Sequence, residues 1–170
     1  MISSISRAFS IARKQNRPAL LTYTVAGDNT KKKSLEILKS ISRHVDICEL
    51  GFAHNTPIAD GGQIQTSAYR AIKNGTRLKD VFQIVKKFKK SKFSRPIILM
   101  GYFNPIYQFG LKDFFYNSIK EHFNEFLAIR IKENLSHSKI WKKNIEMDVL
   151  KLSSFFVISS IVIVLFPSVY

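Results

Sequence analysis

The sequence predicts an α/β fold assembled from consecutive βα units. Short apolar runs typical of buried strands alternate with longer segments whose apolar residues recur at the spacing of one helix face. Such alternation favours a parallel sheet with helices packed on it. Glycine and proline, which mark turns, recur up to Gly110 and then almost cease. The α/β pattern is therefore expected over roughly residues 1–120, and the 170 residues suffice for one domain with a sizeable core.

The first elements follow from these two patterns. Residues 2–15 carry apolar side chains near one helix face and predict a short amphipathic helix. Their Ser, Arg and Lys content without acids also fits an organelle transit peptide, whereas the long apolar run of a secretory signal is missing. Residues 18–25 predict a strand, residues 30–42 a helix with leucine and isoleucine toward the sheet, and residues 45–50 a second, buried strand.

The later elements continue the alternation. Residues 63–73 and 78–90 predict two helices, the second with a clear apolar face, and residues 96–100 predict a third strand. Residues 111–120 predict a further helix. Residues 126–131 fit a fourth strand, but the segment that follows them is polar and irregular. The chain is thus expected to hold three to four βα units.

A domain boundary is predicted near residue 120, with residues 121–170 forming a divergent tail. Residues 152–170 contain no charged side chain and are rich in Phe, Val and Ile. Three interpretations stay open: a membrane-spanning helix of borderline length, a buried strand pair, or a sequence created by a change of reading frame near residue 120. The abrupt loss of Gly and Pro and the apolar terminus favour the third interpretation.

The net charge of +15 lies almost entirely in residues 1–120 and raises the possibility of nucleic-acid binding. The stretch Lys86–Lys92 is a basic run with Phe88 inside it. On a helix, the aromatic ring turns to the core and the lysines to water, and no recognition motif accompanies the run. A solvated helix face is the favoured interpretation, and no nucleic-acid partner is expected.

Metal and thiol chemistry find little support in the sequence. A single cysteine, Cys48, excludes an intrachain disulfide and favours a reducing compartment. Because Cys48 precedes Glu49 on a strand, it should face the helices on the opposite side of the sheet. No metal-ligand spacing relates the four histidines, His44, His54, His122 and His137.

Two carboxylates stand out at the end of the second predicted strand. Glu49 closes an apolar run, and Asp60 lies on the following loop beside Gly61. Enzymes with parallel sheets keep catalytic groups at the carboxyl ends of strands. A carboxyl group against an apolar strand end has its pKa raised and can exchange protons near neutral pH, whereas a hydrated one stays ionised. Spacing alone favours the plainer alternative of a salt-bridged strand residue and a turn residue.

Four sequence blocks, in order, resemble the tryptophan synthase alpha chain family. The first is Leu21–Asp28, and the second is the Glu-Leu-Gly, Pro-Ile-Ala-Asp-Gly and Gln-Ile-Gln signature within Glu49–Gln65. Arg70–Gly75 and Ile98–Ile106 complete the match, which covers roughly residues 5–120. The chain departs from the family at Ala53–Thr56, where Pro-Phe-Ser-Asp is common, and this departure affects the shape of the loop.

The resemblance implies a partial (β/α)8 TIM barrel and a cytoplasmic lyase of tryptophan biosynthesis without a cofactor of its own. The family cleaves indole-3-glycerol phosphate to indole and glyceraldehyde 3-phosphate by a retro-aldol reaction. By resemblance, Glu49 is the general acid–base, and Asp60 accepts a hydrogen bond from the indole N–H. Tyr102 and Met100 would line the indole pocket, with Tyr23 or Thr24 nearby. The role of Gln65 stays open.

The resemblance also implies a partner and a restriction. The family pairs with the tryptophan synthase beta chain in a heterotetramer of two alpha and two beta chains, through loops that correspond to Pro57 and Asn104–Ile106. A complete barrel takes about 250 residues, so this chain supplies about half of one, and the family's later phosphate-binding loops have no counterpart. Little or no lyase activity is expected of the 170 residues alone, and an open sheet edge should favour aggregation. The alternatives are an inactive fragment attached to a membrane through its tail and a basic nucleic-acid-binding protein.

Overall fold

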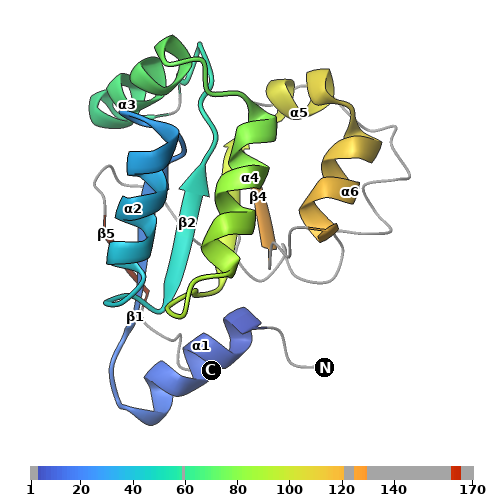
Figure 1. Ribbon diagram of the computed structural model, residues 1–170. Helices are drawn as coiled ribbons and strands as arrows, with labels where there is room; N and C mark the ends of the chain where they lie inside the picture. The colour runs from blue at the N-terminus through green and yellow to red at the C-terminus, as the bar shows by residue number, and fades with distance from the viewer. Residues whose placement is uncertain (1–3, 59, 121–124, 130–161, 166–170) are drawn as a thin grey trace.

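The computed structural model describes residues 4–58, 60–120, 125–129 and 162–165, which form one curved sheet with helices around it (Figure 1). The sheet has five strands in the order β4-β3-β2-β1-β5. Strands β1 to β4 are parallel neighbours, whereas β5 runs antiparallel to β1. The strands are β1 (Ala19–Val25), β2 (Ile47–Gly51), β3 (Ile97–Tyr102), β4 (Glu125–Ile129) and β5 (Val162–Leu165).

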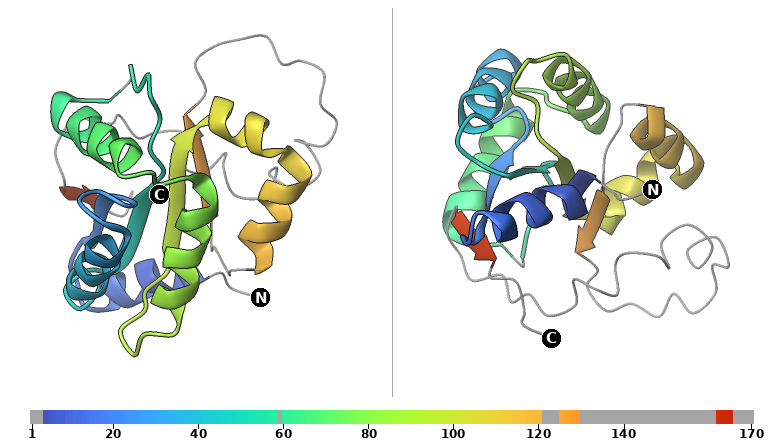
Figure 2. Two further views of the ribbon diagram at one scale, coloured as in Figure 1. Left: turned by 45° about the horizontal axis from the view of Figure 1, so that its top comes forward. Right: turned by 90° about the horizontal axis from the view of Figure 1, so that it is seen from below.

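The helices follow the strands in the alternating order that the sequence predicts. Helices α2 and α4 cover one face of the sheet, α3 lies at its carboxyl end, and α1 crosses beneath its amino end (Figures 1 and 2). Helix α2 begins where the Thr30 side chain accepts a hydrogen bond from the Lys33 N–H at 3.0 Å, a side-chain N-cap. The helices are α1 (Ser4–Lys14), α2 (Lys31–Ile41), α3 (Gly62–Lys73), α4 (Leu78–Lys89), α5 (Phe103–Phe109) and α6 (Leu111–Lys120).

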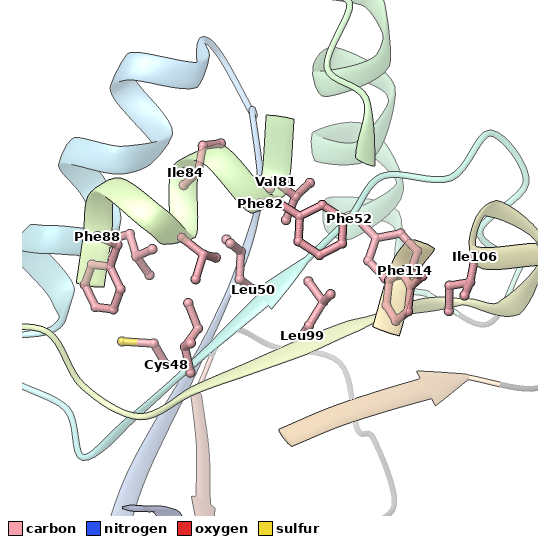
Figure 3. Close-up of a cluster of buried hydrophobic side chains, with 14 of the residues drawn as sticks. Cys48, Leu50, Phe52, Val81, Phe82, Ile84, Phe88, Leu99, Ile106 and Phe114 are labelled. Carbon is pink, nitrogen blue, oxygen red and sulfur yellow. The ribbon is translucent and has the colours of Figure 1, made fainter. Parts of the chain in front are cut away.

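The main hydrophobic core fills the space between the sheet and the helices (Figure 3). Alternate strand residues point into it, because successive side chains of a strand face opposite sides. Cys48 and Leu50 of β2 enter this core, as does Leu99 of β3, so the predicted orientation of Cys48 is confirmed. The aromatic residues that meet them come from the helices and the loop after β2: Phe52, Phe82, Phe88 and Phe114.

A second, smaller core lies on the other face of the sheet. Ile5 and Ala8 of α1 pack against Leu21, Ile47 and Ile98, one residue from each of the first three strands. Helix α1 therefore closes the amino end of the inner face, and it packs on the sheet through the apolar side that the sequence pattern predicts. The residues two positions further along each strand share this face, and they form the floor of the site described below.

The structure departs from the sequence predictions after the third strand, where residues 103–109 form the short helix α5 and a loop was expected. The fourth strand, which fitted residues 126–131 in the sequence, is described over Glu125–Ile129 and adds to β3 in parallel. Strands β1 to β4 therefore form a parallel sheet.

The predicted tail falls mostly outside the described residues. Within residues 152–170, only β5 is described, and it pairs with the edge of β1. Among the described residues, no helix reaches the length and apolarity that crossing a membrane requires.

Candidate active site at the carboxyl ends of the strands

A pocket lies where the carboxyl ends of β1, β2 and β3 meet the loop after β2 and helix α3. Its cavity volume of about 10 Å³ holds roughly one water molecule. A ligand the size of an aromatic ring can enter only if the surrounding loop moves. The residues that line the pocket are Tyr23, Val25, Phe52, Ala53, His54, Pro57, Asp60, Ile64, Ala68, Met100, Gly101 and Tyr102.

Glu49 lies on β2 beneath this pocket, on the same face of the sheet. Its strand neighbour in register is Tyr23 of β1, which lines the pocket, and on the other side it pairs with Ile98. Only 5% of Glu49 is exposed, and this burial raises the pKa of Glu49 to about 7. A carboxyl group with such a pKa both donates and accepts a proton near neutral pH. The sequence prediction of a proton-exchanging carboxyl at this strand end agrees with this placement.

Asp60 is brought to the pocket by the loop after β2. The Tyr102 hydroxyl donates a hydrogen bond to Asp60 Oδ2 at 3.2 Å, so two sequence-predicted residues meet directly. Burial raises the pKa of Asp60, while the bond from Tyr102 and the charge of His54 oppose that rise. The Asp60 side chain is half-buried, whereas the sequence suggested a more hydrated carboxylate.

Gln65 holds the loop in place from the first turns of α3. Its side-chain amide donates to the carbonyl oxygens of Asp60 at 2.9 Å and of Pro57 at 3.4 Å. The Asp60 N–H also donates to the Pro57 carbonyl at 3.0 Å, which closes a tight turn. Gln65, whose role the sequence left open, thus contacts the backbone on both sides of the turn that carries Asp60.

Tyr23 rather than Thr24 faces the pocket. Burial, and then the negative charges of Asp60 and Glu49, hold the pKa of Tyr23 above its ordinary range, so its hydroxyl stays protonated. Thr24 is the neighbour of Leu50 in register, and Leu50 belongs to the helix-side core. Strand alternation therefore turns Thr24 away from the pocket, and the structure does not bring it together with the other predicted residues.

Met100 and His54 complete the pocket wall. Met100 of β3 is buried and faces the same side as Glu49, as predicted. His54 is a contact that sequence reasoning did not assign to the site: its ring lies 5.0 Å from the Tyr102 ring, centroid to centroid. Burial lowers the pKa of His54, and the nearby Asp60 opposes this shift. Its position in the loop that departs from the family pattern was the available signal.

Helix α3 is tied to the loop after β1 at the rim of the site. Arg70 makes two hydrogen bonds to the Asp28 carboxylate, at 2.7 and 2.8 Å. This pair lowers the pKa of Asp28. Gly27 has a φ of +78°, and a side chain there would overlap Thr76, so the turn requires glycine.

Within the described residues, no group of three or more His, Cys, Asp or Glu side chains could hold a metal ion.

Comparison with known proteins agrees with this architecture. The family model of the tryptophan synthase alpha chain matches residues 9–151. A tryptophan synthase alpha chain from Pelagibacter ubique is 70% identical over 113 residues, which make up 66% of this chain and 43% of that protein. One from Pyrococcus furiosus is 45% identical over 96 residues, 56% of this chain and 38% of that protein. The chain thus spans about two fifths of the length of these relatives.

Solved structures show the same fold. A structure from Aquifex aeolicus superposes with a TM-score of 0.71 at 31% identity, covering 76% of this chain and 51% of that one. A tryptophan synthase complex from Pyrococcus furiosus gives a TM-score of 0.63 at 38% identity, covering 67% and 47%. The family match continues past the boundary predicted near residue 120 and includes β4. Strands β1 to β4 and their helices are therefore part of a (β/α)8 barrel, and the chain belongs to the tryptophan synthase alpha chain family.

Proposed function

We propose that the pocket is the acid–base and indole-binding part of a lyase site that cleaves indole-3-glycerol phosphate to indole and glyceraldehyde 3-phosphate. The observation that carries the proposal is the placement of Glu49, a buried carboxyl group with a pKa of about 7, below a pocket that contains Asp60. Family membership supports the same reaction class.

Glu49 would serve as the general acid–base of the retro-aldol step. Cleavage of the carbon–carbon bond requires a proton at C3 of the indole ring and removal of a proton from the glycerol hydroxyl. A group that is near half-protonated at neutral pH can perform either transfer. The Tyr23 hydroxyl, held in its protonated form beside Glu49, would help to orient the carboxyl group.

Asp60 would accept a hydrogen bond from the indole N–H. Positive charge develops on the indole ring as C3 is protonated, and a nearby carboxylate stabilises that charge. The hydrogen bond from Tyr102 and the bond from Gln65 to the Asp60 backbone hold this carboxylate in position. Met100 and the Tyr102 ring would form apolar walls for the indole, once the loop after β2 moves to open the cavity.

A chimera tests this proposal directly. Residues 1–120 would replace the corresponding part of the Pelagibacter ubique relative, and indole release from indole-3-glycerol phosphate would be measured. We expect turnover by the chimera and a loss of roughly 10²-fold or more in Glu49→Gln. A folded chimera whose turnover is unaffected by Glu49→Gln would overturn the assignment. The 170-residue chain alone is expected to show little or no turnover.

A second proposal concerns the partner, the tryptophan synthase beta chain. Two large apolar side chains protrude from the segments that follow β2 and β3: Ile58 is 69% exposed and Tyr107 is 66% exposed. They lie beside Pro57 and Asn104–Ile106, the predicted docking positions. Co-purification of the chimera with a beta chain should fall in Ile58→Asp and stay unchanged in Tyr116→Ser, an exposed control on α6. Equal co-purification of both variants would argue against this surface.

A further inference from the structure

A hollow at the opposite end of the sheet gathers arginines from three separate loops. It has a volume of about 550 Å³ and lies at the amino ends of β1, β2 and β3, the lower end of the sheet in Figure 1. It shares no lining residue with the pocket near Asp60. The described residues that line it are Arg17, Pro18, Leu20, Arg43, His44, Val45, Asp46 and Arg95.

Two of these arginines are held by neutral groups. Arg95 Nε donates to the carbonyl oxygen of Ser42 at 3.0 Å. The Arg43 guanidinium lies 4.7 Å above the centroid of the Phe93 ring, a cation–π contact that leaves its N–H edges accessible. Among the described residues, neither guanidinium forms a salt bridge with a carboxylate. Within the described part of the chain, both guanidinium groups are thus held by neutral partners rather than by a direct ion pair.

The third arginine, Arg17, forms an ion pair with Asp46, the acidic residue in the described lining of the hollow. Arg17 makes two hydrogen bonds to the Asp46 carboxylate, at 2.7 and 2.8 Å. The bond from Arg17 is the main cause that lowers the pKa of Asp46, which also feels the charge of Arg95. Three guanidinium groups thus face one carboxylate in the described lining, and the hollow carries a surplus of positive charge.

We propose that this hollow binds a small anion with two or more negative charges, of the phosphate or diphosphate class. Guanidinium groups present paired N–H donors that match the oxygen atoms of a phosphoryl group. A concave site with arginines from different loops can surround such a group, and two guanidinium groups that form no direct ion pair among the described residues match a dianion. The described lining contains no Phe, Tyr or Trp side chain on which nucleobases could stack, so a compact anion fits better than a nucleic acid.

Isothermal titration of the full 170-residue chain with inorganic pyrophosphate, at constant ionic strength, tests this site. Arg43→Gln and Arg95→Gln should each weaken binding by roughly tenfold, the effect of losing a charge-assisted hydrogen bond. Arg13→Gln is the matched control: it removes the same charge from the exposed side of α1, outside the hollow, and binding should change less than about twofold. Titration with inorganic phosphate then separates a site for one phosphoryl group from a site for two.

Three results would overturn the proposal. The first is the absence of binding at millimolar pyrophosphate. The second is an equal loss in all three variants, which would indicate attraction by the overall charge. The third is tighter binding of a single-stranded RNA that competes with pyrophosphate, which would make the surface a nucleic-acid site. Arg95 contacts the Ser42 backbone, so its variant must first show an unchanged thermal midpoint; Arg43, whose side chain is exposed, provides the test that does not depend on that contact.

Discussion

Folding favours the protonated form of the Glu49 carboxyl group relative to the unfolded chain, and this couples folding to pH. Burial raises its pKa from 4.5 to about 7. Between these two values the folded chain binds more protons at this site than the unfolded chain does, so the free energy of unfolding decreases as pH rises. The contribution of neutral Glu49 is fully present below pH 4.5 and is lost above pH 7.

Glu49→Gln should therefore stabilise the chain at high pH. Glutamine keeps a similar shape without a charge, so at pH 8 the free energy of unfolding should rise by about 3 kcal/mol, the equivalent of the pKa difference. At pH 4 the variant and the parent should differ little. Urea unfolding at the two pH values measures this, with the exposed Glu36→Gln as control. If the variant and the parent differed in free energy of unfolding by the same amount at pH 4 and pH 8, ionisation of Glu49 would not be the cause of the difference.

The hydrogen bond from Tyr102 to Asp60 can be tested in a second variant. Tyr102→Phe removes the hydroxyl that favours the ionised carboxylate, so the pKa of Asp60 should move further upward, the direction in which burial already shifts it. Titration of the Asp60 carboxyl carbon by NMR would measure the change. Tyr107→Phe, at an exposed position on α5, should leave that titration unchanged. A lower pKa of Asp60 in Tyr102→Phe would contradict the geometry.

At the residue scale, the sequence predicted the carboxyl groups better than their surroundings. The strand end and the glycine-rich loop made Glu49 and Asp60 visible in the sequence, but spacing alone favoured a structural interpretation, and the resemblance to the family supplied their predicted roles. The choice between Tyr23 and Thr24 could not be made, because both lie in one apolar run and only the pairing of Tyr23 with Glu49 decides which side chain faces inward. The contact of His54 with Tyr102 depends on loop geometry, which local sequence patterns do not determine.

At the element scale, the packing of the Tyr23 ring from β1 over β2 depends on a glycine in β2. A side chain on Gly51 would overlap the hydroxyl end of Tyr23, whereas Gly62, at the start of α3, faces open space. Gly51→Ala should lower the free energy of unfolding by about 1–3 kcal/mol, because the packed ring must shift. Gly62→Ala should be neutral or stabilising by up to about 1 kcal/mol, since alanine favours a helix. Denaturant unfolding compares the two, and equal effects would argue against a specific overlap at Gly51.

The element boundaries were predictable where hydrophobic periodicity is strong. The amphipathic patterns of 30–42 and 78–90 agree with α2 and α4, and the apolar runs agree with β1 to β3, within about two residues. Helix α5 was missed because its seven residues are too few to show a period and include a proline. Pro105 lies in the first turn, where a missing N–H costs little, and Gly110, with a φ of +95°, ends the helix.

At the scale of the whole molecule, the parallel order of the sheet followed from the alternation of elements, but the partner of the β1 edge did not. A strand–helix alternation predicts that β1 to β4 lie side by side. It contains no information on β5, which comes from the apolar tail and pairs with β1 in the antiparallel sense. The family model matches through residue 151 and so includes β4, whereas the domain boundary near residue 120 stays a prediction.

The imbalance of charge predicts how the whole molecule responds to salt. The chain has 27 Lys and Arg against 12 Asp and Glu, and like charges that are crowded together destabilise a compact state. The ion pairs among the described residues, such as Arg70 with Asp28, are partly exposed and contribute little each. Screening of the repulsion should therefore outweigh screening of these attractions.

The free energy of unfolding should rise by about 1 kcal/mol between 10 and 300 mM NaCl, a range over which the Debye length falls from about 30 Å to less than 8 Å. Urea titrations in NaCl, with glucose of equal osmolality as control, would measure this, and a decrease with salt would mean that the attractive pairs dominate.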